Sequence, residues 1–422
     1  MPHSTPATNR TGTTAATAHE RTTATAGRPG RLVIGTLLAA STLTIMAAAV
    51  ISPSLPALGP ALGSGSDDGV LVRLALTITS LGIALTAVVV GSASDRLGPV
   101  PVLLGSLALY AVAGVAGAFA PSLAVLLVTR VLLGIGVGGV MTSISTLITR
   151  EFDGEERRRY IGLQQTFASL GGVVFLPLAG WLSTIAWNAP FWIYAAAAAV
   201  LPFAAVAFRS RQRPAPSATP PRPGSGAPMP QRAVHQVLGI LVVAGVGTLV
   251  FFMAPTQLPF LLADRGASAT LIGIVVAAST ASSAVAAALF PQVRRHLDQV
   301  GVTAVSLVLL GLGWVVVGMT SFTAVLFIGV LVGGLGVGLV VPTLNLWIVD
   351  LVPAERRGRA LGGLVSAIFL GQFLSPLVLA PLVSRIGVAD AFAVSGALTV
   401  VVVLLGLGAH RLRRPISMTP RP

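Results

Sequence analysis

The chain has 422 residues, of which 54% are hydrophobic and only 9% charged, and its mean hydropathy is +0.88. Soluble globular proteins carry about 25% charged residues, so this composition excludes an ordinary soluble fold and indicates a helical membrane protein. The net charge is +14, and cysteine is absent, which excludes disulfides and thiolate chemistry.

Residues 1–30 are rich in Thr, Ala, Pro and Ser, and we expect them to form a disordered cytoplasmic tail. Long uncharged stretches follow, each able to span a bilayer. We expect helices over 32–51, 72–92, 101–119 and 123–148, and two more within 160–208, divided near Asn188 and Pro190. Prolines at 53, 56 and 60 predict a loop after the first helix.

A proline- and arginine-rich segment, residues 209–233, predicts a cytoplasmic linker. The layout then repeats, with helices expected over 235–254, 267–290, two within 299–349, 360–383 and 391–409. The sequence therefore predicts an all-α polytopic membrane protein of twelve transmembrane helices in two six-helix repeats. The N-terminal half covers 31–208 and the C-terminal half 234–410, and a cytoplasmic tail covers 411–422.

The arginines predict the orientation. Of the 27 basic residues, all arginine, 23 fall in the tails and in alternate loops that share one side. By the positive-inside rule both termini are cytoplasmic, in a multi-pass protein of the plasma (inner) membrane. A basic chain could also bind nucleic acid, but arginines placed between apolar spans favour membrane loops, and we expect no nucleic-acid partner.

The two halves align at an offset of 200 residues. Gly134, Gly136 and Gly138 correspond to glycines at 334, 336 and 338, and Glu155 and Arg157 have counterparts at 355 and 357. Because the glycines lie inside a predicted span, we interpret them as helix-packing positions rather than as a dinucleotide-binding loop. Other positions differ, since Arg130 aligns with a valine, so the scaffold is duplicated while the chemistry is asymmetric.

A charged turn follows the second predicted helix and contains Gly91, Asp95, Arg96 and Gly98. This pattern, with the repeat, resembles the loop between helices 2 and 3 of the major facilitator superfamily, although the basic residues that follow in the family are absent here. The resemblance covers residues 31–410 and implies a transporter whose halves rock about a central site.

The resemblance also implies a conformational gate. In the family, the aspartate matching Asp95 holds the halves together at the cytoplasmic face, and here its candidate partners are Arg150, Arg157 and the start of helix 11. The predicted gate residues are Gly91, Asp95, Arg96, Gly98, Glu155, Arg157, Glu355 and Arg357.

Arg130 is the one charge deep in a predicted span, and it matches a similar superfamily arginine in helix 4. A buried guanidinium normally faces a cavity or a partner, and the alternative is a side chain that reaches the outer interface. Further candidates for substrate or coupling contacts are amides predicted within or near the spans: Gln164, Gln165, Asn345 and Gln372, with Gln257 as another cavity amide. For each amide, helix–helix packing is the competing interpretation.

The fifth predicted helix resembles the antiporter signature imperfectly, because Leu176 and Trp181 stand where the pattern has glycine. None of the thirteen acidic residues lies in mid-span, so proton coupling rests on the resemblance alone. We expect a monomeric secondary transporter in the lipid bilayer that moves a small-molecule substrate by proton-coupled efflux of drug-like compounds. The alternatives are a small-metabolite carrier and a transport-dead sensor. No residues support an enzyme, a cofactor or a metal site.

Overall fold

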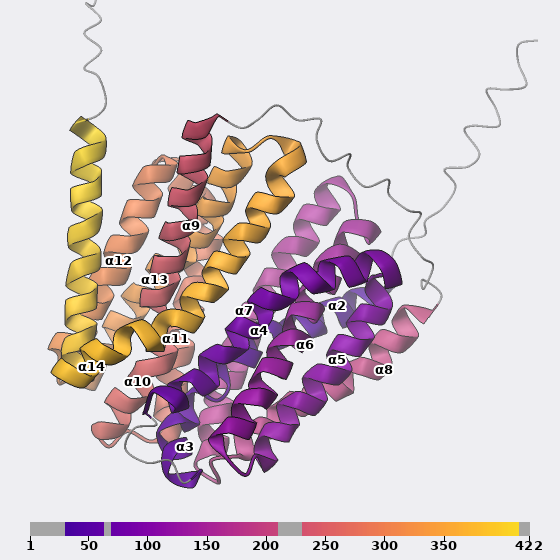
Figure 1. Cartoon of the computed structure of the whole chain (residues 1–422), viewed down its shortest axis with the longest axis horizontal. Helices are drawn as coiled ribbons and strands as arrows, with labels where there is room; N and C mark the ends of the chain where they lie inside the picture. The colour runs from indigo at the N-terminus through magenta and orange to yellow at the C-terminus, as the bar shows by residue number, and fades with distance from the viewer. Residues whose placement is uncertain (1–29, 63–68, 210–229, 413–422) are drawn as a thin grey trace, which may run out of the picture.

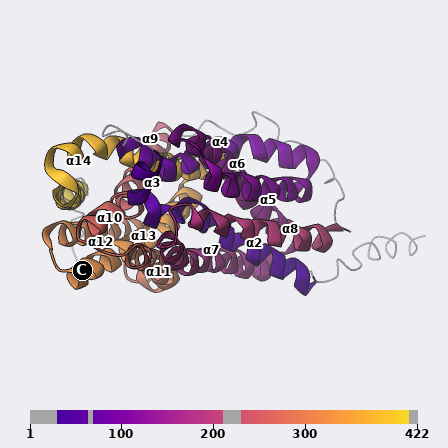
Figure 2. The ribbon, with the colours of Figure 1, turned by 90° about the horizontal axis from the view of Figure 1, so that it is seen from below.

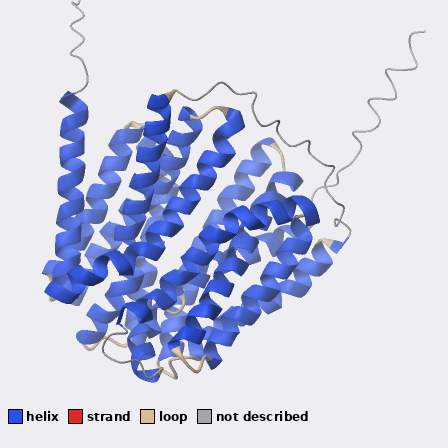
Figure 3. Ribbon diagram, in the orientation of Figure 1, coloured by secondary structure: helices blue, strands red, loops and turns tan. Residues whose placement is uncertain are grey.

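The computed structural model describes residues 30–62, 69–209 and 230–412. Within these ranges the chain forms helices and no strand (Figure 3). The predicted N-terminal tail, most of the predicted linker and residues 413–422 lie outside the described residues.

The first half contains these elements in chain order: α2 (Arg31–Ala49), η1 (Ser52–Ser54), α3 (Leu55–Ala61), α4 (Gly69–Leu97), α5 (Pro99–Ala116), η3 (Gly117–Phe119), α6 (Leu123–Glu151), α7 (Gly154–Ser183), η4 (Ala189–Ala195) and α8 (Ala196–Ala207). The second half contains α9 (Gln231–Phe251), α10 (Met253–Asp264), α11 (Ala269–Arg294), α12 (Gln299–Met319), α13 (Thr323–Leu351) and α14 (Ala354–Leu412).

The predicted count of twelve spans is confirmed. Eleven described helical stretches are long and apolar enough to cross a membrane, and the last of them covers 53 residues, Arg356–Gly408. Gly387, with φ 81° and ψ 170°, breaks the helical backbone inside α14. Glycine adopts this conformation without steric cost, so one long helix becomes two antiparallel spans.

The predicted loop at the three prolines is wrong, because residues 52–61 continue the first span as η1 and α3. Pro53 and Pro56 occupy the second positions of η1 and α3, within the first turn of each. A first helical turn does not need the missing N–H, and the fixed φ of proline suits it. The seventh span likewise continues through α10 beyond its predicted end at 254.

The glycines of the repeat pack alike in both halves. A Cβ added at Gly136 would meet Ser106 of α5, and one added at Gly336 would meet Ser306 of α12, exactly 200 residues later. The pattern recurs for Gly134 beside Thr79 and Gly334 beside Ser279, and for Gly138 beside Ile83 and Gly338 beside Ser283. These positions let helices approach at backbone distance, as small residues do in membranes.

Each half therefore forms its own tightly packed bundle, and the bundles meet along two seams, α4 against α14 and α7 against α11. Figure 2 shows the halves side by side from below. In Figure 1 they converge where α3 and α10 lie and diverge toward the start of α9. We call these the α3–α10 end and the linker end, the latter holding Arg209 and Gln231, which lie near the two ends of the linker.

Replacing Gly336 by alanine places a methyl group against the Ser306 carbonyl and the Leu310 amide. We expect the free energy of unfolding to fall by about 1–3 kcal/mol, because α12 and α13 must separate. Gly105→Ala is the matched control, since an added Cβ there has no neighbour within 4 Å. Thermal unfolding in detergent measures both variants, and equal melting temperatures would contradict the packing account.

Candidate functional site

The candidate site is the interface between the two halves. Hydrogen bonds cross this interface at different distances from the α3–α10 end. At the α3–α10 end, the Ser52 hydroxyl donates to the Pro255 carbonyl at 2.6 Å. In the same region, Arg73 Nε donates to Gln257 Oε1 at 2.7 Å. Deeper toward the linker end, the Ser80 hydroxyl donates to Gln372 Oε1 at 2.9 Å. These bonds join η1 and α4 of one half to α10 and α14 of the other.

Backbone contact closes the other seam at the same end. A Cβ added at Gly273 of α11 would lie 3.2 Å from the Cα of Gly180 in α7, and one added at Gly180 would lie 3.0 Å from the Cα of Thr270. Gly180 belongs to the imperfect antiporter-like pattern, whereas Gly171 packs on Thr42 within its own half. Gly171 and Gly180 therefore serve helix approach, and Gly180 serves it across the interface, whereas Gly162 has open space around it.

Aromatic rings contribute to the apolar surface between the halves. Phe251, Phe260 and Phe369 of the second half pack against the buried core of the first. Leu176 of the first half in turn lies in the core cluster of the second. The interface therefore combines apolar rings with a few amides, a composition typical of sites for small organic ligands.

The structure separates the predicted amides by depth. At 1.5 Å per residue, Gln164 and Gln165 lie about 15 Å into α7 from its linker end, and Gln372 about 27 Å into α14. Asn345 lies about 9 Å from the linker end of α13 and donates to the Val341 carbonyl of its own helix. Gln372 and Gln257 are thus the predicted amides that the structure brings into hydrogen bonds across the interface.

Arg130 lies inside the first half and is 0% exposed. Its Nη2 donates to the carbonyls of Gly114 at 3.0 Å and Ala113 at 3.3 Å, at the end of α5. Its Cζ lies 4.8 Å from the ring centroid of Phe191 and 5.0 Å from that of Tyr194. The interpretation that the Arg130 side chain reaches the outer membrane interface is therefore wrong. The contacts of Arg130 instead join α5, α6 and η4 of one bundle.

Two of the predicted gate arginines occupy equivalent places. Arg157 Nε donates to the Phe152 carbonyl and Arg357 Nε to the Val352 carbonyl, both at 2.9 Å. Arg157 also pairs with Asp153 at 2.7 Å, and Glu155 lies exposed in the first turn of α7. These arginines brace the turns that connect α6 to α7 and α13 to α14.

The charged turn itself is only partly described. Gly98 has φ 87° and precedes α5, as expected for a turn glycine. The backbone of α4 extends to Leu97 and so includes the other three motif positions. The side chains of Asp95 and Arg96, the surroundings of Gly91 and the side chain of Glu355 lie outside the described residues.

The sequence model that describes the Major Facilitator Superfamily as a family matches residues 37–298 and 240–422, which together are most of the chain. The chain belongs to the Major Facilitator Superfamily.

Relatives and solved structures agree with this assignment. An uncharacterised MFS-type transporter of Mycobacterium tuberculosis is 32% identical over 252 residues, which are 59% of this chain and 33% of that relative, so the match spans about a third of the relative's length. The class C tetracycline resistance protein of Escherichia coli is 27% identical over 363 residues, 82% of this chain and 87% of its own. A POT family transporter crystallised with 5-aminolevulinic acid has a TM-score of 0.75 at 12% identity, covering 90% of this chain and 96% of its own. That last likeness shows the superfamily fold.

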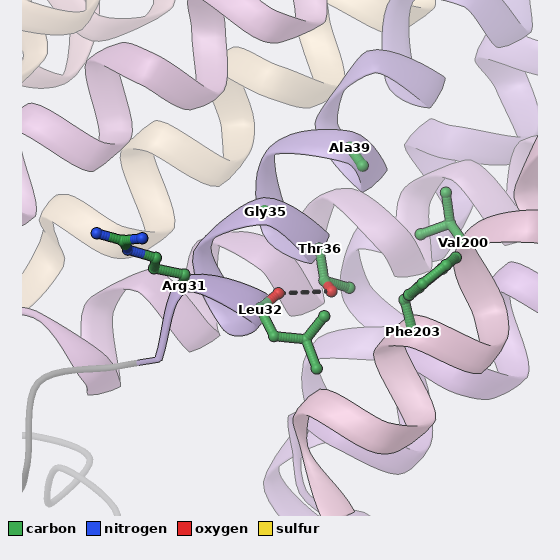
Figure 4. Close-up of a pocket in the computed structure, with 7 residues that line it drawn as sticks. All are labelled: Arg31, Leu32, Gly35, Thr36, Ala39, Val200 and Phe203. Atoms are coloured by element: carbon green, nitrogen blue, oxygen red, sulfur yellow. Dashed lines mark hydrogen bonds between the residues drawn. The ribbon is translucent and has the colours of Figure 1, made fainter.

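A small groove lies apart from the superfamily's central interface. It is a pocket of about 190 Å³ between α2 and α8, lined by Leu32, Gly35, Val200, Phe203 and neighbouring residues (Figure 4). Ligand pockets usually measure about 300–1,000 Å³, and the lining belongs to one half alone. We therefore place the candidate transport site at the interface and not in this groove.

Sequence reasoning missed Arg73 and Ser52 as interface residues, although it named Gln257 among the cavity amides. In the arginine distribution, Arg73 was only one of the few arginines on the side opposite the predicted cytoplasmic side. Its position could have indicated an interface role, because Arg73 lies four residues into α4, at the edge of the apolar span. An arginine there pairs or snorkels, and pairing needs an acceptor that only the fold brings near.

Arg130→Ala removes the hydrogen bonds to Ala113 and Gly114 and the contact with the Phe191 ring. Bonds to a charged donor contribute about 1.5–3 kcal/mol each, so we expect a marked fall in melting temperature and in membrane abundance. Thermal unfolding and quantitative immunoblotting measure these effects, and Arg209→Ala, at an exposed arginine, is the control. Lost transport with wild-type stability would instead favour the substrate or coupling role.

Proposed function

We propose that this superfamily member is a secondary active transporter that moves a small organic solute by alternating access. The observation that carries the proposal is the pair of bundles, each tightly packed inside, which hold each other chiefly at the α3–α10 end. Two rigid bodies joined at one end can rock about the contacts between them. The proposed protein acts as a monomer, because each chain contains both halves.

We further propose that the linker end faces the cytoplasm. The arginine distribution supports this orientation, because 23 of 27 arginines lie in the tails and loops of that side. We propose that the described arrangement, with its contacts at the α3–α10 end, is an inward-facing state of a plasma-membrane protein. No cofactor enters the proposed cycle.

The proposed activity is proton-coupled efflux of drug-like compounds. The tetracycline-resistance relative supports it through its extent, because the match covers most of both chains. The apolar, ring-rich interface with the Ser80–Gln372 pair also suits a lipophilic solute with few hydrogen-bonding groups. The alternative is a small-metabolite importer or exporter.

An accessibility tag placed within 209–232 should be labelled from the cytoplasmic side, because the arginine bias sets the orientation. Impermeant thiol reagents measure this on intact cells and on inverted vesicles, after a single cysteine is introduced into this cysteine-free chain. A cysteine replacing Phe322, in the exposed loop between α12 and α13, is the control and should show the opposite pattern. Labelling of residues 209–232 in intact cells would contradict the orientation.

Gln372→Ala should lower solute flux at least about tenfold, because it unpairs the Ser80 hydroxyl and removes an amide from the interface. Flux is measured in proteoliposomes with tetracycline and a panel of small metabolites, with and without an imposed proton gradient. Gln236→Ala, at an exposed position of α9, is the control and should leave flux unchanged. Gradient-dependent movement of metabolites alone would support the alternative, and a wild-type protein that moves no probe would contradict both.

A further inference from the structure

Arg73 is held by both halves at once. Its Nη1 donates to the Gly69 carbonyl one turn earlier in α4 at 2.8 Å, which anchors the guanidinium in the first half. Its Nε donates to Gln257 of the second half, and its Cζ lies 4.1 Å from the centroid of the Phe260 ring. Two residues of one short helix, α10, thus contact a single cation from the opposite bundle.

The Gln257 side chain makes this contact costly to break. It is 0% exposed, and its Nε2 has no hydrogen-bond partner among the described residues. Its Oε1 accepts from Arg73. A buried acceptor that loses its partner retains the full desolvation penalty, and a bond to a charged donor is among the strong ones. The Ser52–Pro255 bond lies two residues away along α10, so the contacts form one patch.

We propose that Arg73, Gln257 and Phe260 form a latch that keeps the α3–α10 end closed and must open in every transport cycle. The inference rests on the proposed function, because alternating access requires the halves to separate at this end. Opening moves α10 away from α4, so the hydrogen bond and the cation–ring contact are lost together. The strength of the latch therefore sets the ratio of outward-open to inward-open molecules.

The internal repeat shows that the latch is an asymmetric feature. The position 200 residues after Arg73 is Gly273, which approaches the α7 backbone instead of extending a side chain. One seam is thus closed by a cation and the other by backbone packing. A polar latch can be tuned by single substitutions, whereas backbone packing responds to added volume.

The test measures the distance between spin labels on cysteines that replace Ile185 and Phe322, which are 65% and 74% exposed, in the loops after α7 and after α12. Arg73→Gln should raise the ratio of outward-open to inward-open molecules about tenfold, because it removes the cation. Gln257→Glu should lower that ratio, because it replaces the amide with a carboxylate beside Arg73. Phe260→Leu should raise it by a smaller factor.

The control is Arg385→Gln, which removes an exposed arginine of α14 at the same end and should leave the distances unchanged. Thermal unfolding checks that each variant is folded. If Arg73→Gln does not fold, Phe260→Leu still tests the latch, because leucine keeps an apolar side chain at that position. Distance distributions that match the control in Arg73→Gln, Gln257→Glu and Phe260→Leu would overturn the latch. Distances are recorded without substrate, so shifted distances in a protein that transports nothing would support the latch and contradict only the proposed function.

Discussion

Close backbone packing inside each half is the constraint on which the rest of the structure depends. Lipid provides no hydrophobic drive to bring helices together, so they associate through close contact of small residues. Gly136 and Gly336 let α6 and α13 approach α5 and α12 at backbone distance. Such contacts tolerate little deformation, which makes each half a rigid unit. Conformational change is then confined to the surface between the halves.

That surface is sparing in polar contacts, which suits an alternating carrier. States that exchange during a cycle differ by only a few kcal/mol, so an interface held by many strong bonds would trap one of them. Here Ser52, Arg73 and Ser80 each donate one hydrogen bond across it. In the proposed cycle, the contribution of Arg73 is large on this scale, so the opposite state would need compensating contacts at the linker end. Asp95 remains the predicted source of those contacts.

The fold was predictable from sequence because bilayer thickness and turn chemistry leave few choices. Spans were found from uncharged stretches, and the repeat from its 200-residue offset. The prolines at 53 and 56 led to the wrong prediction of a loop. The energetic cost of a proline in a helix depends on whether it lies in the first turn, and the sequence does not show where a turn starts. The site was less predictable, since Arg73 and Gln257 are 184 residues apart in sequence. Gln164 and Asn345 were correctly assigned to helices, but their separation in depth follows from helix boundaries.

The repeat also explains why chemistry and scaffold diverge along one chain. The glycines of α6 and α13 that carry backbone contact, at 134, 136 and 138 and at 334, 336 and 338, are the same in both halves, because a side chain there would force the helices apart. Two charged positions within the helices differ: Arg130 aligns with Val330, and Arg73 with Gly273. In the first half, Arg130 fills a space beneath Phe191 and Tyr194 and bonds to the end of α5. The second half meets the same need with apolar contact between Trp314 and Phe392 and the bond from Trp314 to the Val250 carbonyl. A duplicated scaffold can thus stay rigid in both copies while each copy holds its helix ends with different chemistry.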